Sequence, residues 1–374
     1  MSNGNRQGTG AAPERPLLTV IVPAYNEESI IQRSLSAICE YLAALETEYR
    51  WELIVVNDGS TDATGEIAES FASKRDHVIV LHHKFNFRLG QALRFAFNRS
   101  RGDYVVVLDI DLSYSPDHIG RMLARMKQTG AKIVIASPYT KGGKVTNVPW
   151  FRKLLSLWAN HFLAMTVAKD SQSDKLTTIT GMVRAYDGDF LRRMSLKSMD
   201  VEINPEIIYK AKILRARIME CPAHLDWKPE CESRSPIKRR KSSLKVARSL
   251  VHHVLSGYIF RPFMFFIVPG AVIFALSLYP LTWTVLNTIR EYRRIANPAL
   301  TFDYRLSEAI GTAFRTSPHA FIVGGIALLV AIQLVSLGFL SLQKKRYFEE
   351  LYYLNTIMYR DLRHDNESGT SSFQ

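Results

Sequence analysis

Residues 17–27 read Leu-Leu-Thr-Val-Ile-Val-Pro-Ala-Tyr-Asn-Glu, a short apolar run that ends at a proline and several polar residues. Similar β-branched runs recur, and the expected strands are 18–22, 52–57, 78–81, 104–108 and 132–136. Stretches with helical periodicity separate them, at 29–45, 62–73, 90–98 and 117–128. This alternation predicts an α/β domain of βαβ units on a mostly parallel, Rossmann-like sheet. The strands are apolar on both faces, which indicates that helices cover both sides of the sheet.

Three clusters containing acidic residues follow three of these strands. They are Val22-Pro-Ala-Tyr-Asn-Glu27, Asn57-Asp-Gly-Ser-Thr-Asp62 and Asp109-Ile-Asp111. Taken singly, each cluster has an ordinary interpretation as a turn or a helix cap. Together they occupy the carboxyl ends of successive strands, where open α/β folds bind their ligands. We therefore expect them to converge on one crevice.

The third cluster indicates a metal site. Side chains alternate along an extended segment, so Asp109 and Asp111 are expected on the same side of the chain. Two neighbouring carboxylates repel each other unless a cation neutralises them. A hard divalent cation, Mg²⁺ or Mn²⁺, prefers oxygen ligands and would bridge to a diphosphate. The sequence has no Gly-x-Gly-x-x-Gly motif and no P-loop, which disfavours a dinucleotide-dependent oxidoreductase or an NTPase.

The charge of the chain is concentrated in one segment. The 374 residues include 48 Lys and Arg against 35 Asp and Glu, a formal net charge of +13. Residues 234–261 contribute eight Lys or Arg and no Asp or Glu, with apolar residues at helical spacing. Such a basic amphipathic segment is typical of helices on an anionic membrane surface, and a solvated linker is the alternative. A nucleic-acid partner is not needed to explain the charge.

Two long uncharged stretches follow. Residues 262–289 have no charged side chain, and residues 316–343 have only His319, which is neutral at pH 7. Each exceeds the roughly 20 residues that cross a bilayer as a helix, so we expect two transmembrane helices. Basic residues before the first and after the second favour a cytoplasmic N-terminal domain and C-terminus. The five arginines of the loop between them weaken this orientation rule.

The ends of the chain complete the expected organisation. The N-terminus is polar and lacks the apolar region of a signal peptide, and the three cysteines are irregularly spaced, as in a reducing compartment. The expected parts are a disordered N-terminus (1–16), the α/β domain (17–232), a basic amphipathic juxtamembrane segment (233–261), two transmembrane helices (262–289 and 316–343), a non-cytoplasmic loop between them (290–315), and a cytoplasmic C-terminal helix and tail (344–374).

These motifs resemble those of the family-2 glycosyltransferases with the GT-A fold. More narrowly, they resemble the dolichol-phosphate-mannose synthase group of polyprenyl-phosphate glycosyltransferases. The resemblance covers residues 17–230, and the pair of C-terminal spans is similar to that of bacterial members which anchor themselves. It implies inverting, metal-dependent transfer of a hexose from a GDP- or UDP-sugar to dolichyl or undecaprenyl phosphate at the cytoplasmic membrane face. A homo-oligomer is possible by the same resemblance.

The resemblance also assigns residues. It implies that the nucleoside is held by Pro23, Tyr25, Glu27, Val56 and Asp58, and that ribose, diphosphate and metal are held by Asp109, Ile110 and Asp111, with Ser113 as a further metal contact. The stretch from Trp150 to Asn160 resembles the acceptor helix of the family, in which Arg152 and Ser156 would bind the lipid phosphate; four residues apart, they share one helix face. Arg234 and Arg240 are the favoured positions for a later pair of phosphate-binding residues. Asp111 and Arg152 are the expected catalytic residues.

Several positions depart from the family pattern. The family's Ser-Arg-Tyr is Ser137-Pro138-Tyr139 here, so Lys141 or Lys144 would have to replace the arginine. Arg88 stands where glycine is common. Residues 180–186 resemble a family strand, and Glu202 and Glu206 fall where the family carries acidic residues, as site residues or as structural groups.

Two other functions remain open at this stage. An acceptor phosphate is largely ionised at neutral pH, with a second pKa of about 6, and needs no general base. A lipid or glycan hydroxyl would need a carboxylate base, for which the candidates are Asp187, Asp189, Asp200 and Glu202. A non-catalytic membrane scaffold that binds nucleotide sugars is the other alternative, against which the intact Asp109 and Asp111 argue.

Overall fold

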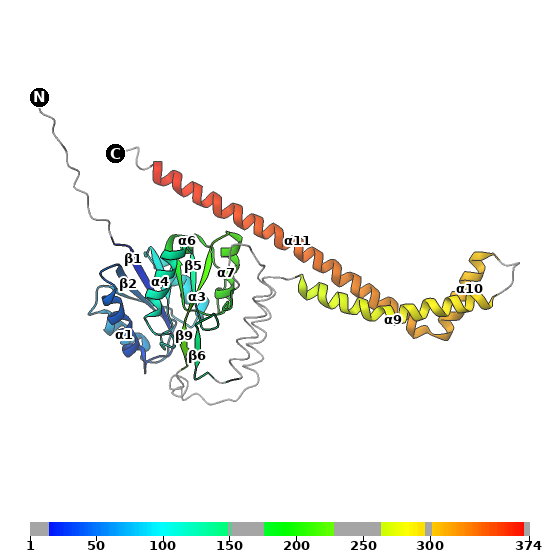
Figure 1. Ribbon diagram of the computed structural model, residues 1–374, viewed down its shortest axis with the longest axis horizontal. Helices are drawn as coiled ribbons and strands as arrows, with labels where there is room; N and C mark the ends of the chain where they lie inside the picture. Colours follow the sequence, from blue (N-terminus) through cyan, green and yellow to red (C-terminus); the bar gives the residue numbers. More distant parts are fainter. Residues whose placement is uncertain (1–14, 149, 151–175, 228–262, 296–300, 370–374) are drawn as a thin grey trace, which may run out of the picture. The chain divides into compact units, whose positions relative to one another are not determined.

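The computed structural model describes residues 15–148, 150, 176–227, 263–295 and 301–369. The chain divides into two compact units, residues 1–256 with 353–374 and residues 257–352, each described here by itself. The first unit contains a seven-stranded sheet in the order β3-β2-β1-β4-β7-β5-β8 (Figure 1). Its strands are β1 (Leu17–Ala24), β2 (Arg50–Asn57), β3 (Val78–His82), β4 (Tyr104–Val107), β5 (Ile133–Ser137), β7 (Arg184–Asp187) and β8 (Ile218–Pro222).

The expected mostly parallel sheet is confirmed. Strand β7 alone runs antiparallel to its neighbours β4 and β5, and the other pairs of this sheet are parallel. The helices of the domain are α1 (Ile31–Ala44), α2 (Thr64–Ala72), α3 (Leu89–Arg99), α4 (His118–Thr129), α6 (Gly188–Arg193) and α7 (Ile203–Ile213). All five expected strands and all four expected helices of residues 17–137 are present, and no end is shifted by more than two residues.

Both faces of the sheet are buried, as the apolar strands predict. On one face, Val20 and Val22 share a core cluster with Leu35 and Ile38 of α1, and residues of α2 and α4 join the same cluster. The alternate residue Ile21 is also fully buried, because α3 packs against β1 and β2 from the other side. Helices on both faces leave the carboxyl edge of the strands as the place where polar loops can gather.

A second, two-stranded sheet supports one of these loops. Strands β6 (Lys144–Thr146) and β9 (His224–Asp226) pair in parallel. The backbone N–H of Asp226 donates to the carbonyl of Ser113 at 2.9 Å, and the N–H of His224 donates to Nε2 of the buried His118 at 3.1 Å. The loop that follows Asp111 is therefore tied to residues more than 100 positions later in the chain.

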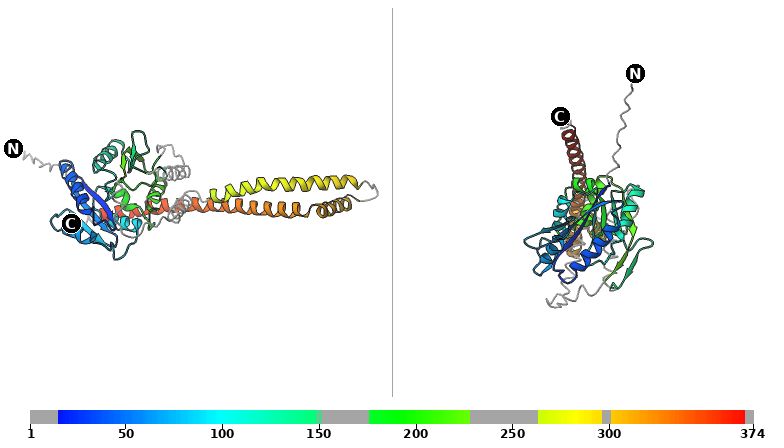
Figure 2. Two further views of the ribbon diagram at one scale, coloured as in Figure 1. Left: turned by 90° about the horizontal axis from the view of Figure 1, so that it is seen from below. Right: turned by 90° about the vertical axis from the view of Figure 1, so that its left-hand side faces the viewer.

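The second unit is helical. It contains α9 (Met264–Arg294), α10 (Phe302–Thr316) and the larger part of α11 (Pro318–Gly369). Helices α9 and α11 lie side by side and antiparallel (Figure 2), since Gly270 approaches Val335 and Gly338 approaches Ile267. Glycines at such positions let two apolar helices approach closely.

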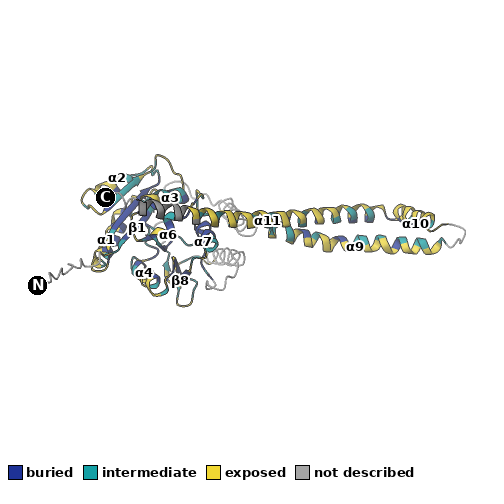
Figure 3. Cartoon of the chain, turned by 90° about the horizontal axis from the view of Figure 1, so that it is seen from above, coloured by how far each residue is buried: buried dark blue, intermediate teal, exposed yellow. Residues whose placement is uncertain are grey.

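Two of these helices are long and apolar enough to cross a membrane. They are Met264–Arg294 and Pro318–Thr356, of mean hydropathy 2.1 and 2.5, and only 11% and 17% of their most apolar windows is buried. Figure 3 shows the contrast between these largely exposed helices and the buried strands of the sheet. The low burial distinguishes them from core helices of a soluble domain. The helical tail expected after residue 343 is present, but as an uninterrupted continuation of α11, since no proline or glycine intervenes before Gly369.

Candidate active site

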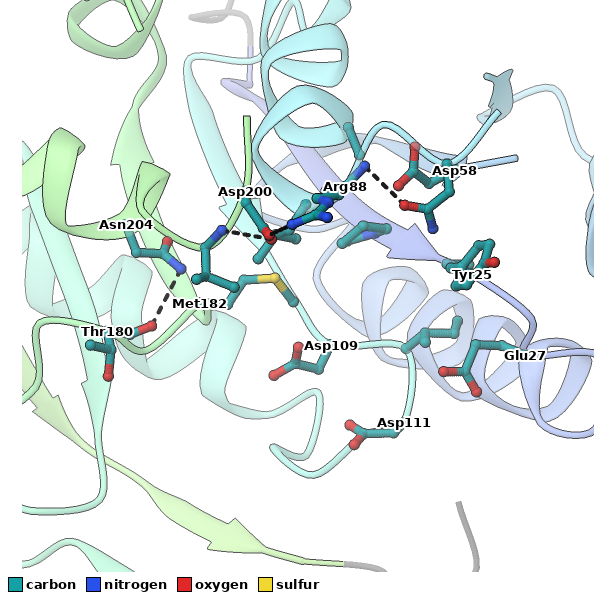
Figure 4. A pocket seen from close by; sticks show the side chains of 17 residues that line it. Tyr25, Glu27, Asp58, Arg88, Asp109, Asp111, Thr180, Met182, Asp200 and Asn204 are labelled. Atoms are coloured by element: carbon teal, nitrogen blue, oxygen red, sulfur yellow. Dashed lines mark hydrogen bonds and ion pairs between the residues drawn. The ribbon is translucent and has the colours of Figure 1, made fainter. Parts of the chain in front are cut away.

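A cleft of about 590 Å³ opens at the carboxyl ends of β1, β2 and β4 (Figure 4). The three polar clusters of the sequence meet there, as expected. The residues from these clusters that line it are Pro23, Ala24, Tyr25, Glu27, Asp58, Asp109, Ile110 and Asp111. Later segments complete the wall with Asn86, Arg88, Leu89, Ala92, Thr180, Met182, Asp200, Val201 and Asn204.

Hydrogen bonds connect the loops that follow β1 and β2. The backbone N–H of Asn26 donates to Oγ of Ser60 at 3.0 Å, and its side-chain oxygen accepts from the N–H of Thr61 at 2.8 Å. Asn26 has a left-handed backbone, with φ of 56°, which asparagine tolerates better than most residues. This turn leaves Tyr25 44% exposed at the cleft, where its side chain is accessible to a ligand.

Asp58 connects the second cluster to the next loop. Its Oδ1 accepts from the backbone N–H of Phe87 at 3.0 Å and lies 2.7 Å from Nδ1 of His83. The ring of His83 stacks on Phe95 of α3, with centroids 5.1 Å apart. Asp58 is nearly buried, and its carboxylate therefore both lines the cleft and holds residues 83–87 beside it.

Asp109 and Asp111 share a tight turn, which differs from the extended segment expected from the sequence. Strand β4 ends at Val107, the N–H of Leu112 donates to the carbonyl of Asp109 at 3.2 Å, and Leu112 has φ of 51°. The N–H of Ser113 donates to Oδ1 of Asp111 at 2.8 Å. Both carboxyl groups line the cleft as expected, but a turn brings them there and not the alternation of a strand.

The carboxyl groups at this end oppose one another's ionisation. Burial and the neighbouring Asp111 carboxylate raise the pKa of Asp109 to about 7. Burial, followed by Asp111 and Asp62, also raises the pKa of Glu27 to about 7. Such mutual repulsion is relieved by a bound cation. Among the described residues, however, no group of three or more His, Cys, Asp or Glu side chains could hold a metal alone, so a ligand would have to supply further oxygens.

Comparison with known proteins identifies a family for this chain. Residues 19–194 match the family model Glycosyl transferase family 2. The chain is 32% identical over 202 residues to the polyprenol monophosphomannose synthase of Mycolicibacterium smegmatis, covering 52% of this chain and 72% of that protein. It is 31% identical over 208 residues to the undecaprenyl-phosphate mannosyltransferase of Micrococcus luteus, covering 54% and 80%. This chain belongs to glycosyl transferase family 2.

Another relative matches over a smaller share of its length. The dolichol-phosphate mannosyltransferase of Pyrococcus furiosus is 32% identical over 205 residues, which cover 55% of each protein. Among solved structures, the mannosyltransferase PcManGT from Pyrobaculum calidifontis, in complex with GDP-Man and Mn²⁺, is 18% identical, with a TM-score of 0.42 over 94% of this chain and 88% of that one.

Some expected site residues of this family-2 glycosyltransferase do not line the cleft. Val56 lies within β2 and is fully buried. Ser113 is 7% exposed, and its backbone joins Asp111 to Asp226. Lys141 and Lys144 are described but are not part of the wall. The expected acceptor-phosphate residues Arg152, Ser156, Arg234 and Arg240 lie outside the described residues.

The four candidate bases differ in their position relative to the cleft, since Asp200 lines it and the other three do not. Asp187 caps α6, accepting from the N–H of Phe190 at 2.9 Å, and pairs with Lys132 at 2.7 Å. Asp189 pairs with Arg192 on the same helix. Glu202 precedes α7 without lining the cleft.

Glu206 has a structural role in the glycosyltransferase domain. Its carboxylate accepts from the N–H groups of Lys197 and Ser198 and pairs with Lys210. Burial raises the pKa of Glu206, but the hydrogen bonds from Lys210 and Ser198 outweigh burial and leave it lowered. The ionised Glu206 thus fixes the loop that carries Asp200.

Asn86 and Asn204 line the glycosyltransferase cleft although sequence reasoning did not single them out. Nδ2 of Asn204 donates to the backbone carbonyl of Thr180 at 3.3 Å, and the backbone carbonyl of Asn204 accepts from Nη1 of Arg184 at 2.9 Å. Arg184 is fully buried and also donates to the carbonyl of Gly181 at 2.8 Å. The resemblance of residues 180–186 to a family strand was the available signal for this wall, and nothing local marked Asn204.

Proposed function

We propose that this glycosyltransferase transfers a hexose from a nucleoside-diphosphate sugar to a polyprenyl phosphate. The observation that carries the proposal is the single cleft in which an exposed aromatic ring, Tyr25, and the paired carboxyls of Asp109 and Asp111 lie together. A purine or pyrimidine base would stack on Tyr25, with Asp58 beside it. The relatives named dolichol-phosphate mannosyltransferase, polyprenol monophosphomannose synthase and undecaprenyl-phosphate mannosyltransferase support the acceptor class.

Asp109 and Asp111 are the residues that would hold Mg²⁺ or Mn²⁺. Their carboxyl oxygens suit a hard cation. Burial and the Asp111 carboxylate raise the pKa of Asp109, and a cation would favour its ionised form. When bound, the metal supplies positive charge that stabilises the departing nucleoside diphosphate. The diphosphate oxygens would complete the coordination that the two aspartates leave open.

The candidate bases of the wall do not favour a hydroxyl acceptor. Asp200 is the only one of the four candidate bases that lines the cleft, and its Oδ2 is engaged by Nη1 of Arg88 at 2.7 Å. A general base must present its carboxylate to the acceptor hydroxyl. An ionised phosphate needs only to be positioned for in-line attack at the anomeric carbon, which inverts that carbon. Arg152, Ser156, Arg234 and Arg240 are the proposed phosphate ligands.

The membrane is the proposed location of the acceptor. Helices α9 and α11 would span it, and the basic segment at 233–261 would lie on its anionic face. The distribution of basic residues around the spans favours a cytoplasmic glycosyltransferase domain.

The test is transfer by the purified full-length chain in lipid nanodiscs with Mn²⁺. GDP-mannose, GDP-glucose, UDP-glucose and UDP-N-acetylglucosamine are each offered with undecaprenyl phosphate or with undecaprenol. We expect a labelled glycosyl phosphate lipid from at least one donor, of inverted anomeric configuration by NMR, and no product with undecaprenol. Product with undecaprenol alone would replace the proposal by the hydroxyl-acceptor alternative. Binding of a nucleotide sugar without transfer to either lipid would support the scaffold alternative.

A further inference from the structure

Arg88 has a backbone conformation that an arginine rarely adopts. It stands directly before α3 with φ of 72° and ψ of 168°, a region occupied almost only by glycine. Its N–H donates to Oδ1 of Asn86 at 3.1 Å, and its carbonyl accepts from the N–H of Ala92 at 3.1 Å, so the surrounding chain holds it there. A strained position that carries a long side chain in place of glycine points to a role for that side chain.

The side chain of Arg88 reaches Asp200, 112 positions later in the sequence. Nη1 of Arg88 lies 2.7 Å from Oδ2 of Asp200, and the two side chains are 52% and 24% exposed at the cleft (Figure 4). Hydrogen bonding and charge attraction from Asp200 raise the pKa of Arg88 further above its ordinary value. An ion pair this exposed contributes little to folding, so stability does not account for the strained arginine.

Contacts with α3 and α7 hold the segments that carry Arg88 and Asp200. The loop that carries Asp200 rests on the first turn of α3, where the N–H of Gln91 donates to the carbonyl of Met199 at 3.2 Å. The contact is so close that a Cβ at Gly90 would lie 2.6 Å from the carbonyl oxygen of Ser198. Glu206 holds the same loop from α7. The pair is thus preorganised across the wall of the cleft.

The charges of the cleft indicate what this pair would contact. Among the described residues that line it, five are carboxylates and Arg88 is the only cation. In the proposed function the nucleoside lies at Tyr25 and Asp58 and the diphosphate at Asp109 and Asp111. The hexose must then extend to the remaining wall, formed by Arg88, Asp200, Thr180, Met182 and Asn204.

We propose that the Arg88–Asp200 pair binds hydroxyl groups of the transferred hexose and sets which hexose is accepted. The inference rests on the proposed function. A guanidinium donates hydrogen bonds and a carboxylate accepts them, so the pair matches two adjacent hydroxyls of a sugar. Bonds to charged groups are the stronger kind, and an epimer that misplaces a hydroxyl leaves a charged partner unsatisfied. Discrimination between epimers follows from the fixed spacing of the two groups.

The test uses Arg88→Gly, which removes the side chain and relieves the backbone, and Asp200→Asn, which keeps the shape of the carboxyl. Arg121→Ala, which removes an exposed pair with Asp117 on α4, is the matched control. Calorimetry with Mn²⁺ measures binding of the free nucleoside diphosphate and of the nucleotide sugar. Transfer measures kcat/KM for two epimeric donors, GDP-mannose and GDP-glucose or their UDP counterparts.

For both cleft variants we expect nucleoside diphosphate affinity within about 2-fold of the parent, nucleotide-sugar affinity lower by about 10-fold, and a preference between epimers reduced by about 10-fold. Equal loss of affinity for the diphosphate and for the nucleotide sugar would overturn the inference and place Arg88 on the diphosphate. Unchanged affinities would also overturn it. Because binding is measured without transfer, a parent that binds nucleotide sugar but transfers nothing defeats the proposed acceptor and leaves this test intact.

Discussion

The two ends of the cleft are built in different ways. The end with Tyr25, Asp58, Asp109 and Asp111 is assembled from short motifs directly after strands, each within a few residues of the sheet. The end with Arg88 and Asp200 is assembled from the start of α3 and a loop before α7, which only tertiary packing brings together. The first end follows from the ends of neighbouring parallel strands. The second depends on packing between two segments that are more than 100 positions apart in the sequence.

The largest expected effect is at the strand-end motifs. Asp111→Asn removes one of two proposed metal ligands, and we expect transfer to fall by at least about 100-fold, the scale on which lost electrostatic stabilisation acts. The measurement is kcat at saturating donor and Mn²⁺. Asp76→Asn, at an exposed site outside the cleft, is the matched control and should retain parental activity. Parental activity in Asp111→Asn would contradict the metal assignment.

Asp58 is a proposed nucleoside contact and also supports residues 83–87, so its loss should affect both binding and folding. Asp58→Ala leaves the N–H of Phe87 and the ring of His83 without their acceptor, which costs about 1–3 kcal/mol of unfolding free energy. We also expect nucleoside diphosphate affinity to fall by about 10-fold. Denaturant unfolding and calorimetry measure the two effects. Asp58→Asn retains an acceptor oxygen and should recover most of the stability; if both variants unfold like the parent, Asp58 does not support the loop.

The pH dependence of folding tests how His118 supports the loop that follows Asp111. Burial lowers the pKa of His118, although its hydrogen bond to the Ser115 carbonyl and the nearby Asp117 partly oppose this; Arg121 and His224 lower it further. The unfolded chain therefore takes up a proton at a higher pH than the folded one. The stability that neutral His118 contributes is present above about pH 6.5 and is lost as the pH falls toward its folded pKa.

His118→Phe should flatten this dependence. The measurement is denaturant unfolding of the parent and the variant between pH 5 and 8. His77→Gln, at an exposed position, is the control and should keep the parental slope. Equal slopes in His118→Phe and the parent would show that the pH dependence of folding does not come from His118.

The smallest expected effect is on folding at the other end of the cleft. Arg88→Gly removes only an exposed ion pair and relieves a left-handed backbone, so we expect a melting temperature no lower than that of the parent. Differential scanning calorimetry measures this. A melting temperature well below that of the parent would mean that the ion pair holds the two segments together. The pair would then stabilise the fold, which contradicts the account of this end of the cleft.

The same distinction explains what the sequence could predict. The succession of β-branched runs and helical stretches located β1 to β5 and their helices to within two residues, because each element is encoded locally. The convergence of the three clusters followed from the parallel topology alone. The tight turn at Asp109–Leu112 was not predicted, because the left-handed φ of Leu112 has no signal in a leucine.

The end of the cleft with Arg88 and Asp200 was harder to predict, because it depends on contacts between segments far apart in the sequence. Arg88 was visible as a departure from glycine and Asp200 as one of four possible bases, but nothing in the sequence indicates that they meet. Asn204 is positioned by Arg184, a buried arginine that bonds backbone carbonyls, and that contact depends on how β7 packs beside α7. The strands β6 and β9 are three residues each, too short to give a periodic pattern.

The most direct test of the central claim is a single-turnover transfer experiment in nanodiscs with Mn²⁺ and a radiolabelled nucleotide sugar. The parent and Asp111→Asn are each offered undecaprenyl phosphate or undecaprenol. The account predicts label in a glycosyl phosphate lipid with the parent and undecaprenyl phosphate, and at least about 100-fold less with Asp111→Asn. Label in undecaprenol, or equal transfer by both proteins, would contradict it.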